Sequence, residues 1–576
     1  MHFSRRLPSD TLSGQSSVRM KPAFLSRRYR YVLMVLGLMP GLQAAPTPFP
    51  LLDGLGHHHR QVTQASPQAQ RYFDQGMALF YGFSHGGAIK SLREAEKSSP
   101  DCALVHWAIA LCYGSNINDP MHGSAVAPAW HELQEAVRTS ATAGPVEQAL
   151  IHALSARYQE HPPADRTPLD VAYADAMRSV WKRYPKDADV GVLFADALMN
   201  LRPWNQWTLD GKPQPGTEEV ISTLDAVLAL DRWHPYANHL YIHALEASSH
   251  PERAIPAADR LLHLQPLIAH EDHMPSHIYI RVGRWQDAIA ANETAIAAQH
   301  RYAALVGPPP GDLSIYNAHN EHMLGYAAMM TGEGALAVRH MKAAYDDLAP
   351  QVSEDYPDVV DYFAAMSVEV RVRFGRWNDL LAVPPYPATL PFSEAYRHAA
   401  RAVAFAAKGN NPAARAEQTT YLTQAKPLSN GSHLFGLNRL AGVLAIVTPM
   451  LEGELDVREG KLETGLASLR AAVGAQDQLA YDEPPGWLIP ARHSLGAALV
   501  SAGRLSEAEK VYREDLAHLP NNGWSLYGLS QTLRLEGRNA EAVQVDQRFH
   551  RAWAKTDIEI DRSCLCQSPV KAGGEN

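Results

Sequence analysis

The sequence predicts an all-α fold in which helical hairpins stack into a solenoid. A pattern of small and apolar residues recurs along most of the chain, and 46% hydrophobic with 20% charged residues is typical of a folded protein. Two H-x-x-x-H motifs, His239 with His243 and His273 with His277, lie 34 residues apart. That spacing is the length of one helix–turn–helix unit, and such units stack without each needing its own core.

The recurring pattern is that of the tetratricopeptide repeat (TPR). In the first legible unit, Gly76 and Ala88 let two helices approach closely, and Pro100 ends the second helix. The matching positions in this unit are Tyr72, Gly76, Leu79, Ala88, Leu92, Ala95 and Pro100. Later units contain Gly325, Gly453, Gly496 and, in the last unit, Ser530 at the place of Gly76. We therefore expect a single TPR-type α-solenoid over residues 66–556.

Several segments go beyond the generic repeat. They are FDQGMALFYGFSH (73–85), LMNLRPWNQWTLDGKPQPGT (198–217), HLYIHALEAS (239–248), HMPSHIYIRVGRW (273–285) and the stretch 481–516 that begins YDEPPGWLIPARH. In these segments the chain resembles a family of exported bacterial TPR proteins of about this length. The resemblance covers nearly the whole mature chain. The resemblance implies the solenoid architecture. It also implies that positions in the first helix of each repeat line the concave groove, but it implies no activity.

The N-terminus has the pattern of a signal peptide over residues 1–44. Basic residues in Lys21–Arg30 precede the apolar run Tyr31–Leu42, and small residues follow at Ala44. Met20 is an alternative start, because a complete signal follows it. The apolar run is too short to cross a membrane, so no transmembrane anchor is expected. We expect export, with the bacterial periplasm as the destination.

The charge of the mature chain disfavours nucleic acid as a partner. Residues 1–44 hold seven of the 52 basic residues and one of the 61 acidic ones, which leaves 45 and 60 and a net charge of −15. Nucleic acids and anionic membrane surfaces attract basic proteins. A small molecule or a peptide in the groove is the expected ligand, and a protein partner is an alternative.

Two segments flank the predicted solenoid. A Pro/His-rich lead, residues 45–65, contains the triplet His57–His59, for which a solvated loop is favoured slightly over a metal site. A polar C-terminal tail, residues 557–576, contains Cys564 and Cys566; an unstructured tail with incidental cysteines is favoured over a soft-metal site. We expect no disulfide framework.

Histidines gather in the region 236–326. Within each H-x-x-x-H pair the two side chains lie on one helix face, and the one-repeat offset places the two pairs on neighbouring helices. A third helix adds the H-x-x-H motif of His319 and His322. The candidate metal ligands are His239, His243, His273, His277, His319, His322 and Glu246. Four further histidines are treated as background: His234, His250, His263 and His270.

Mostly-imidazole ligation favours a transition metal, with copper first and iron or zinc as alternatives. Paired H-x-x-x-H helices resemble the arrangement in coupled dicopper proteins, an analogy between different folds. With Glu246 as a ligand, a di-iron or dizinc centre is the alternative. The predicted function is an exported metalloprotein, an oxidase or a hydrolase. The alternative is a protein- or peptide-binding TPR scaffold whose groove histidines bind no metal.

Other positions are candidates for the groove or for a lid. Trp204 and Trp207 lie in a Pro/Gly-rich loop that is either a lid or an edge packed on the solenoid. Tyr326 and His493 occupy groove-facing places of their helices. The segment Asp482–Trp487 is interpreted as a rigid turn. No other catalytic motif is recognised, so no catalytic residue is assigned.

Overall fold

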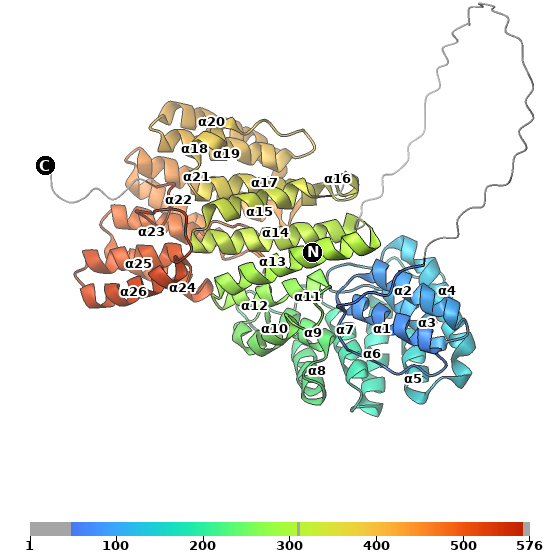
Figure 1. The fold of residues 1–576 in the computed structure, drawn as a ribbon. Helices are drawn as coiled ribbons and strands as arrows, with labels where there is room; N and C mark the ends of the chain where they lie inside the picture. The colour runs from blue at the N-terminus through green and yellow to red at the C-terminus, as the bar shows by residue number, and fades with distance from the viewer. Residues whose placement is uncertain (1–47, 308–310, 349, 568–576) are drawn as a thin grey trace, which may run out of the picture.

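The computed structural model describes residues 48–307, 311–348 and 350–567, and these form hairpin after hairpin of α-helix (Figure 1). The predicted signal segment, residues 1–44, lies outside the described residues. The N-terminal part comprises α1 (Pro67–Tyr81), α2 (His85–Ser98), α3 (Ala103–Cys112), η1 (Gly123–Ala125), α4 (Val126–Thr139), η2 (Ser140–Thr142), α5 (Pro145–Leu154), α6 (Thr167–Arg183), α7 (Ala188–Met199) and α8 (Thr217–Leu230).

The central and C-terminal parts continue the same pattern. The central part comprises α9 (Pro235–Leu245), η3 (Pro251–Ala254), α10 (Ile255–Leu261), α11 (Ala269–His273), α12 (Pro275–Arg281), α13 (Trp285–Val306) and α14 (Gly311–Thr331). The C-terminal part comprises α15 (Gly334–Asp346), α16 (Pro350–Asp355), α17 (Pro357–Arg373), α18 (Trp377–Ala382), α19 (Pro391–Ala407), α20 (Asn411–Leu428), α21 (Leu440–Arg458), α22 (Leu462–Gln476), α23 (Ala491–Ser501), α24 (Leu505–His518), α25 (Gly523–Leu535) and α26 (Asn539–Ala552). One small antiparallel pair, β1 (Leu434–Phe435) with β2 (Asn438–Arg439), precedes α21.

Close helix contact at small residues holds the hairpins together. A Cβ atom at Gly76 on α1 would lie 2.6 Å from Cγ of Leu92 on α2. At Gly453 on α21 it would lie 2.7 Å from Cγ of Leu469 on α22. Side chains larger than hydrogen would push each pair of helices apart. The prediction of an all-α solenoid of TPR-type hairpins is confirmed.

The solenoid curls back on itself at two places. In the N-terminal half, the end of α1 reaches α9, where Nδ1 of His239 donates to the carbonyl oxygen of Tyr81 at 2.7 Å. In the C-terminal half, Trp524 of α25 donates its indole N–H to the carbonyl oxygen of Met329 on α14 at 2.7 Å. Figure 1 shows α13 and α14 running through the middle, between the blue N-terminal and the red C-terminal helices. The centre of the solenoid is therefore enclosed by its own ends.

The segment before α1 is not a solvated loop where His58 lies. Residues 48–65 run along the N-terminal helices, with the backbone N–H of Leu52 donating to Gln75 at 2.8 Å and that of Thr63 to Glu147 at 2.7 Å. His58 is mostly buried against Asp189, whereas His57 is exposed. The loop interpretation of the triplet is wrong for its middle residue, because Asp189 gives that imidazole a buried hydrogen-bond partner.

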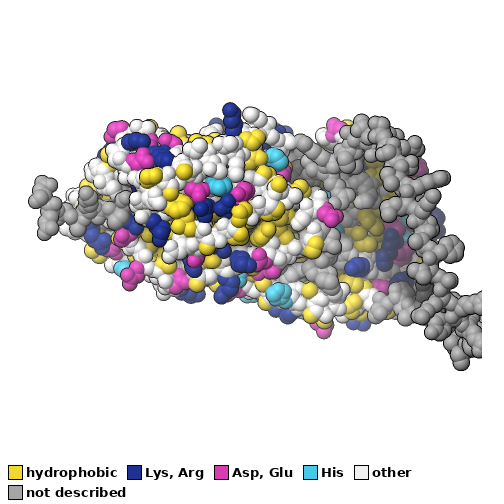
Figure 2. Space-filling view, turned by 90° about the horizontal axis from the view of Figure 1, so that it is seen from above, with side chains coloured by type: hydrophobic (Ala, Val, Ile, Leu, Met, Phe, Trp, Pro, Cys, Tyr) yellow, Lys and Arg dark blue, Asp and Glu magenta, His cyan; other side chains and the backbone are white. Residues whose placement is uncertain are grey.

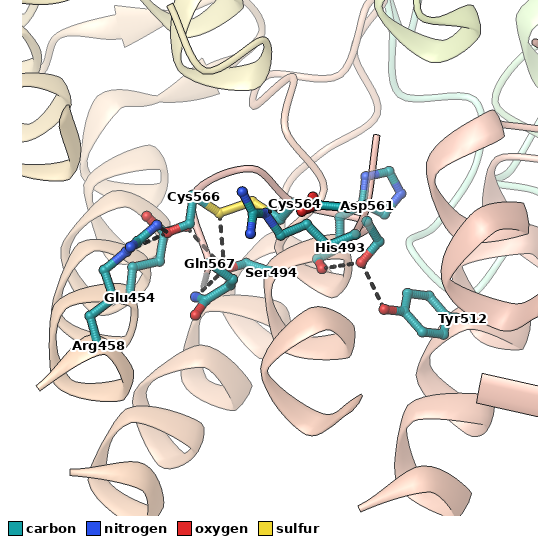
Figure 3. Close-up of a disulfide and its surroundings, with 11 residues drawn as sticks. Glu454, Arg458, His493, Ser494, Tyr512, Asp561, Cys564, Cys566 and Gln567 are labelled. Atoms are coloured by element: carbon teal, nitrogen blue, oxygen red, sulfur yellow. Dashed lines mark hydrogen bonds and ion pairs between the residues drawn. A yellow bond between two sulfur atoms is a disulfide. The ribbon is translucent and has the colours of Figure 1, made fainter. Parts of the chain in front are cut away.

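The C-terminal segment also packs on the solenoid. Cys564 and Cys566 are buried and joined in a disulfide, and Arg458 on α21 donates its Nε–H to the carbonyl oxygen of Cys566 at 2.8 Å (Figure 3). Ser563 donates to the carbonyl oxygen of His493 on α23 at 2.9 Å. The expectation of an unstructured tail with incidental cysteines is wrong for residues up to 567, because these contacts fix the segment across the last repeats. This disulfide joins residues only two apart in the sequence, so it does not form a framework that links distant parts of the described chain.

The molecular surface carries mixed charge. On the face seen in Figure 2, basic and acidic side chains are interspersed among apolar ones. Within the described residues, none of the helices is both long enough and apolar enough to cross a membrane. The features that set this solenoid apart therefore lie in its interior.

Candidate metal centre

Three neighbouring helical segments bring the histidines together. Helix α9 carries His239 and His243, with Glu246 as its C-cap; α11 and α12 carry His270, His273 and His277; and α14 carries His319. Spacings of three and four residues keep the side chains of each segment on one face. These residues form two groups of three histidines, and in each group one ring nitrogen per residue lies within 4.8 Å of the others.

The first trio consists of His239, His243 and His270. The Nδ1–H of His239 donates to the carbonyl oxygen of Tyr81, which leaves the lone pair on its Nε2 atom free. That Nε2 atom, Nε2 of His243 and both ring nitrogens of His270 are buried without a hydrogen-bond partner among the described residues. Buried polar atoms without partners are rare and call for an unseen ligand or water. Here they converge from two segments.

The second trio consists of His273, His277 and His319. Nδ1 of His273 donates to the side-chain oxygen of Asn292 at 2.6 Å, and Nδ1 of His277 donates to Glu246 at 2.7 Å. Both Nε2 atoms are therefore left as potential acceptors, yet they face each other at 2.7 Å. Two lone pairs repel at that distance unless a proton or a metal ion lies between them.

Charge at this trio is concentrated on His277. Burial alone would lower its pKa, but the carboxylates of Glu483 and Glu246 raise the pKa of His277 to about 10. In the metal-free protein, a proton on Nε2 of His277 donated to Nε2 of His273 would account for the 2.7 Å contact. A metal cation between the two Nε2 atoms would replace that proton. The same two carboxylates, Glu246 and Glu483, would stabilise its charge.

The remaining imidazoles are neutral. Burial, together with nearby histidines, lowers the pKa of His239, His243, His270, His273 and His319 well below the ordinary value. Only the neutral imidazole offers a lone pair to a metal. The environment therefore keeps these rings in the form that binds metal.

Glu246 connects the two trios. One carboxylate oxygen accepts from Nδ1 of His243 at 3.0 Å and the other accepts from Nδ1 of His277 at 2.7 Å. The rings of His243 and His277 are 5.9 Å apart between centroids, as are those of His270 and His273. A carboxylate that orients two ligand imidazoles through their far nitrogens is the usual outer partner in histidine metal sites.

Two aromatic residues with unusual backbone geometry border the first trio. Phe83 has φ +58° and Trp204 has φ +57°, a left-handed conformation that bulky side chains rarely adopt. The ring of Phe83 is 4.6 Å from that of His239, and the ring of Trp204 is 5.6 Å from that of His243, between centroids. Backbone strain of this kind clusters at functional sites.

Some predicted residues lie elsewhere. His322 packs its buried ring against Tyr362 and Phe363, at 5.3 and 5.6 Å between centroids, and burial lowers its pKa to about 3. Tyr326 is buried beside Trp285, at 5.9 Å between ring centroids. His493 donates to Asp515 at 2.9 Å. These three do not contact either trio in any described interaction.

The two tryptophans of the Pro/Gly-rich loop have different places. Trp207 donates its indole N–H to the carbonyl oxygen of Ala244 at 2.8 Å, which fastens the loop to the end of α9. Trp204 faces His243 and a cavity beside the histidines. The packed-edge interpretation therefore holds for Trp207, whereas Trp204 lines the cavity and the lid interpretation stays a prediction.

Sequence reasoning missed two members of the site. His270 was treated as background, but it completes the first trio; the signal was present as the H-x-x-H spacing of His270 with His273. Glu483 was interpreted as part of a rigid turn, but its buried carboxylate contacts Nδ1 of His277. That turn lies in the C-terminal part of the sequence, and only the folding of the solenoid places it beside His277.

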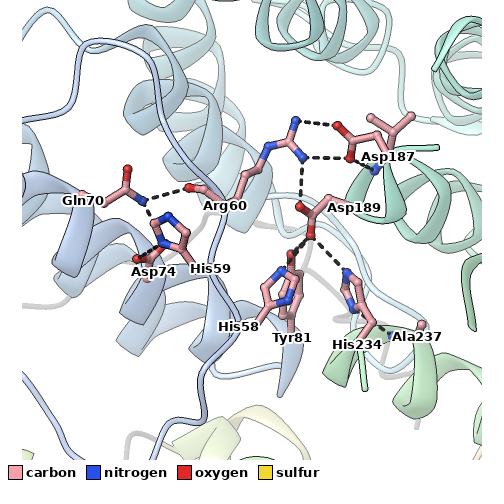
Figure 4. Close-up of polar contacts among 11 residues, drawn as sticks. His58, His59, Arg60, Gln70, Asp74, Tyr81, Asp187, Asp189, His234 and Ala237 are labelled. Atoms are coloured by element: carbon pink, nitrogen blue, oxygen red, sulfur yellow. Dashed lines mark hydrogen bonds and ion pairs between the residues drawn. The ribbon is translucent and has the colours of Figure 1, made fainter. Parts of the chain in front are cut away.

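His234, also treated as background, belongs to a separate cluster near the N-terminus. Asp189 accepts from Nε2 of His58 at 2.9 Å, from Nε2 of His234 at 3.1 Å and from the hydroxyl of Tyr81 at 2.9 Å (Figure 4). Its other oxygen accepts from Arg60 at 2.9 Å. This cluster is an ion-pair network in which Asp189 accepts every one of these hydrogen bonds and Arg60 supplies a positive charge.

Comparison with known proteins gives only distant likenesses. No family model and no curated protein sequence matches the chain. Similar solved structures include a human IFIT1 dimer with m7Gppp-AAAA (14% identity, 86% of this chain, 91% of that chain, TM-score 0.31). Others are yeast Tom70 (10%, 84%, 92%, TM-score 0.29) and the TPR domain of P58(IPK) (12%, 82%, 98%, TM-score 0.22). Scores this low carry no argument, so the TPR-type assignment rests on the helix packing described above.

Proposed function

We propose that this protein is a metalloprotein that binds two metal ions, one at each histidine trio. The observation that carries the proposal is the convergence of six imidazoles in two trios. Four of them, His239, His243, His270 and His319, have buried ring nitrogens without a hydrogen-bond partner among the described residues, and Nε2 of His273 and of His277 face each other at 2.7 Å. Glu246 and Asn292 orient the rings from outside, as in known histidine metal sites. Three imidazoles per ion leave a coordination position for a substrate or water.

Copper is the metal that we favour. Each trio is all-imidazole, and no thiolate is part of either, which suits copper better than a structural zinc cage. Two copper ions held by the trios would supply redox chemistry, with an external oxidant such as dioxygen accepting the electrons, so we assign the protein to the oxidases. Iron or zinc would be favoured if Glu246 turned from its two histidine partners to become a ligand itself, and hydrolysis would then be the expected chemistry.

The alternative of a peptide-binding scaffold is less well supported. Side chains that read a peptide must reach it, but His239, His243, His270, His273 and His277 are at most 7% exposed. The C-terminal segment, with the disulfide of Cys564 and Cys566, also lies across the last repeats. Burial of this kind suits ions and small molecules.

Metal analysis tests the proposal directly. The mature chain, purified without a tag and incubated with copper, zinc or iron, is expected to retain about two ions per chain, with copper preferred. His250, which is exposed and pairs with Glu252, provides the control. The variant His250→Ala should retain the same metal content. If the wild-type protein bound no stoichiometric metal, the scaffold alternative would be favoured instead.

Export to the periplasm is part of the proposal. It is supported by the basic and apolar pattern of residues 1–44 in the sequence. N-terminal sequencing of protein recovered from its native envelope should find a chain that begins near Ala45. Intact Met1 or Met20 in the mature protein would contradict export by this signal.

A further inference from the structure

A cavity opens beside the two trios. Its volume is about 260 Å³, and its lining includes His270 of the first trio together with His277 and His319 of the second. An apolar cavity of about 150 Å³ is known to accommodate one benzene ring in another protein, so this one has room for a ring with a short substituent. A molecule in the cavity would lie directly against both candidate metal positions.

Aromatic side chains form much of the cavity wall. Phe83 and Trp204, the two aromatic residues described above with a left-handed backbone, both line it, and so do Tyr316 and Tyr356. Flat rings stack on such walls or meet them edge to face, which stabilises a bound ring beyond the burial of its area. The backbone strain at Phe83 and Trp204 therefore serves to place two rings at the mouth of the histidine site.

The cavity wall also carries polar atoms that could form hydrogen bonds with a ligand. The indole N–H of Trp204, the side-chain oxygen of Asn118 and Nε2 of His85 are buried without a hydrogen-bond partner in the part of the chain that the structure describes. Together they offer one donor, one acceptor and one ring nitrogen. A ligand with a hydroxyl or an amine group would satisfy them, whereas a bare hydrocarbon would leave them unpaired.

The charge of the wall excludes anions. Asp119, Asp482 and Glu483 line the cavity, and none of the described lining residues is Lys or Arg. A ligand carboxylate would be desolvated next to these acidic groups, and the positive charge of His277 is already engaged by Glu246 and Glu483. A neutral or positively charged ligand meets no such cost.

We propose that this cavity is a substrate pocket for a small aromatic molecule that carries a hydroxyl or amine group and no negative charge. Trp204 is the residue that selects for the ring, and Asp119 contributes to the rejection of anions. The assignment of this molecule as a substrate rests on the proposed function, because the metal ions would act on it. The prediction that it binds in the cavity is independent of the metal ions.

The test is therefore binding to the metal-free protein, measured by isothermal titration calorimetry. Three probes share one phenol ring: 4-methylphenol is neutral, tyramine is cationic and 4-hydroxyphenylacetate is anionic. The neutral and cationic probes should bind at least 10-fold more tightly than the anion. Equal or tighter binding of the anion would overturn the proposal, and so would the failure of all three probes to bind.

Two variants connect the binding to the cavity wall. Trp204→Leu should weaken 4-methylphenol binding at least 10-fold, whereas Trp207→Leu, in the same loop but bonded to Ala244, should change it less than 2-fold. Equal effects of the two substitutions would overturn the role of Trp204. Asp119→Asn should narrow the preference for tyramine over 4-hydroxyphenylacetate at least 3-fold, and an unchanged ratio would contradict the electrostatic argument.

The outcomes separate this proposal from the metal proposal. If the probes bind as expected but the protein takes up no metal, the pocket assignment stands and the oxidase assignment fails. If the protein binds two metal ions but no probe in either metal state, the metal centre stands and the pocket assignment fails.

Discussion

The two histidine clusters of this protein, one near the N-terminus and one in the central repeats, differ in what their imidazole nitrogens contact. Near the N-terminus, His58 and His234 both donate to Asp189, and Arg60 donates to its second oxygen. In the central repeats, the rings of the two trios direct nitrogens at one another, and those of His239, His243, His270 and His319 include nitrogens without a hydrogen-bond partner among the described residues. Both clusters join distant parts of the chain and both are buried. The comparison teaches that convergence of imidazoles alone does not distinguish a metal site from an ion-pair network; our metal proposal rests on the unpaired ring nitrogens of the central cluster.

The two clusters must therefore contribute to stability in opposite ways. Each unpaired buried polar atom costs about 1–3 kcal/mol, so the metal-free trios weaken the fold around them. In the Asp189 network, by contrast, the protein itself supplies all the donors to the carboxylate. Only the central cluster should need a ligand to reach its full stability.

The largest expected effect is that of metal removal. Binding at 1,000 times the dissociation constant stabilises the folded state by about 4 kcal/mol for each site. Chelation should accordingly accelerate amide hydrogen exchange in α9, α11, α12 and α14, and leave α7 near Asp189 unchanged. Exchange measured by mass spectrometry on loaded and chelated protein provides the comparison. Uniform protection in both states would mean that the trios hold no structural metal.

Removing the central carboxylate of the other cluster should be the next most costly change. Asp189→Asn removes the charge that His58, His234 and Arg60 share, although Arg60 keeps Asp187 as an ion-pair partner, and should cost about 1.5–3 kcal/mol at pH 7. Thermal and denaturant unfolding should show this loss, and metal content should not change. A fall in metal content without loss of stability would mean that we have assigned the two clusters the wrong way round.

The same variant has a defined pH dependence. Burial alone would raise the pKa of Asp189, but hydrogen bonds from His234 and His58 hold it well below its ordinary value of 3.8. A carboxylate with a depressed pKa stabilises the fold above that ordinary value and loses this contribution as the pH falls through the folded-state pKa. The deficit of Asp189→Asn relative to wild type should therefore be complete at pH 7 and shrink below about pH 4. A deficit that is independent of pH would contradict an ionised Asp189.

A pair of substitutions on one helix tests the geometry of the second trio. His319 and His322 are three residues apart on α14, but only His319 belongs to a trio, whereas His322 packs on Tyr362 and Phe363. His319→Gln should weaken binding at its site by more than the roughly 10–100-fold that loss of an outer partner costs. His322→Gln should leave affinity unchanged. Competition titration with a chromogenic chelator measures both, and equal losses would restore His322 as a ligand.

The repeat period explains what the sequence could predict. The small residues at Gly76 and Gly453 recur because every hairpin needs close contact, so the solenoid is legible from the chain alone. His239, His243, His273 and His277 keep the same phase, so their meeting follows from stacking. Of the predicted metal ligands, the structure brings all except His322 into this neighbourhood.

Contacts outside the period could not be predicted in this way. Glu483 reaches His277 because the C-terminal repeats fold back over the centre, and a repeat pattern contains no information about such closure. Phe83 and Trp204 reach the site through strained turns. His322 shares a helix with His319, but its side chain lies on the side that faces α17. The packing of neighbouring helices, rather than the sequence spacing, therefore determines which of these two histidines belongs to a trio.

The smallest expected effect concerns the segment before α1, and it separates anchoring from metal binding. His58 fastens this segment to the solenoid through one hydrogen bond to Asp189, and Arg60 holds it independently. His58→Ala should therefore cost only about 1–2 kcal/mol, the range for a hydrogen bond to a charged group. Limited proteolysis should cut residues 48–65 faster, with metal content and probe binding as in wild type. The exposed neighbour His57 offers the control, because His57→Ala removes a similar side chain that makes no buried contact. If His58→Ala instead reduced metal content, the N-terminal cluster would have to be counted as a metal site despite Arg60.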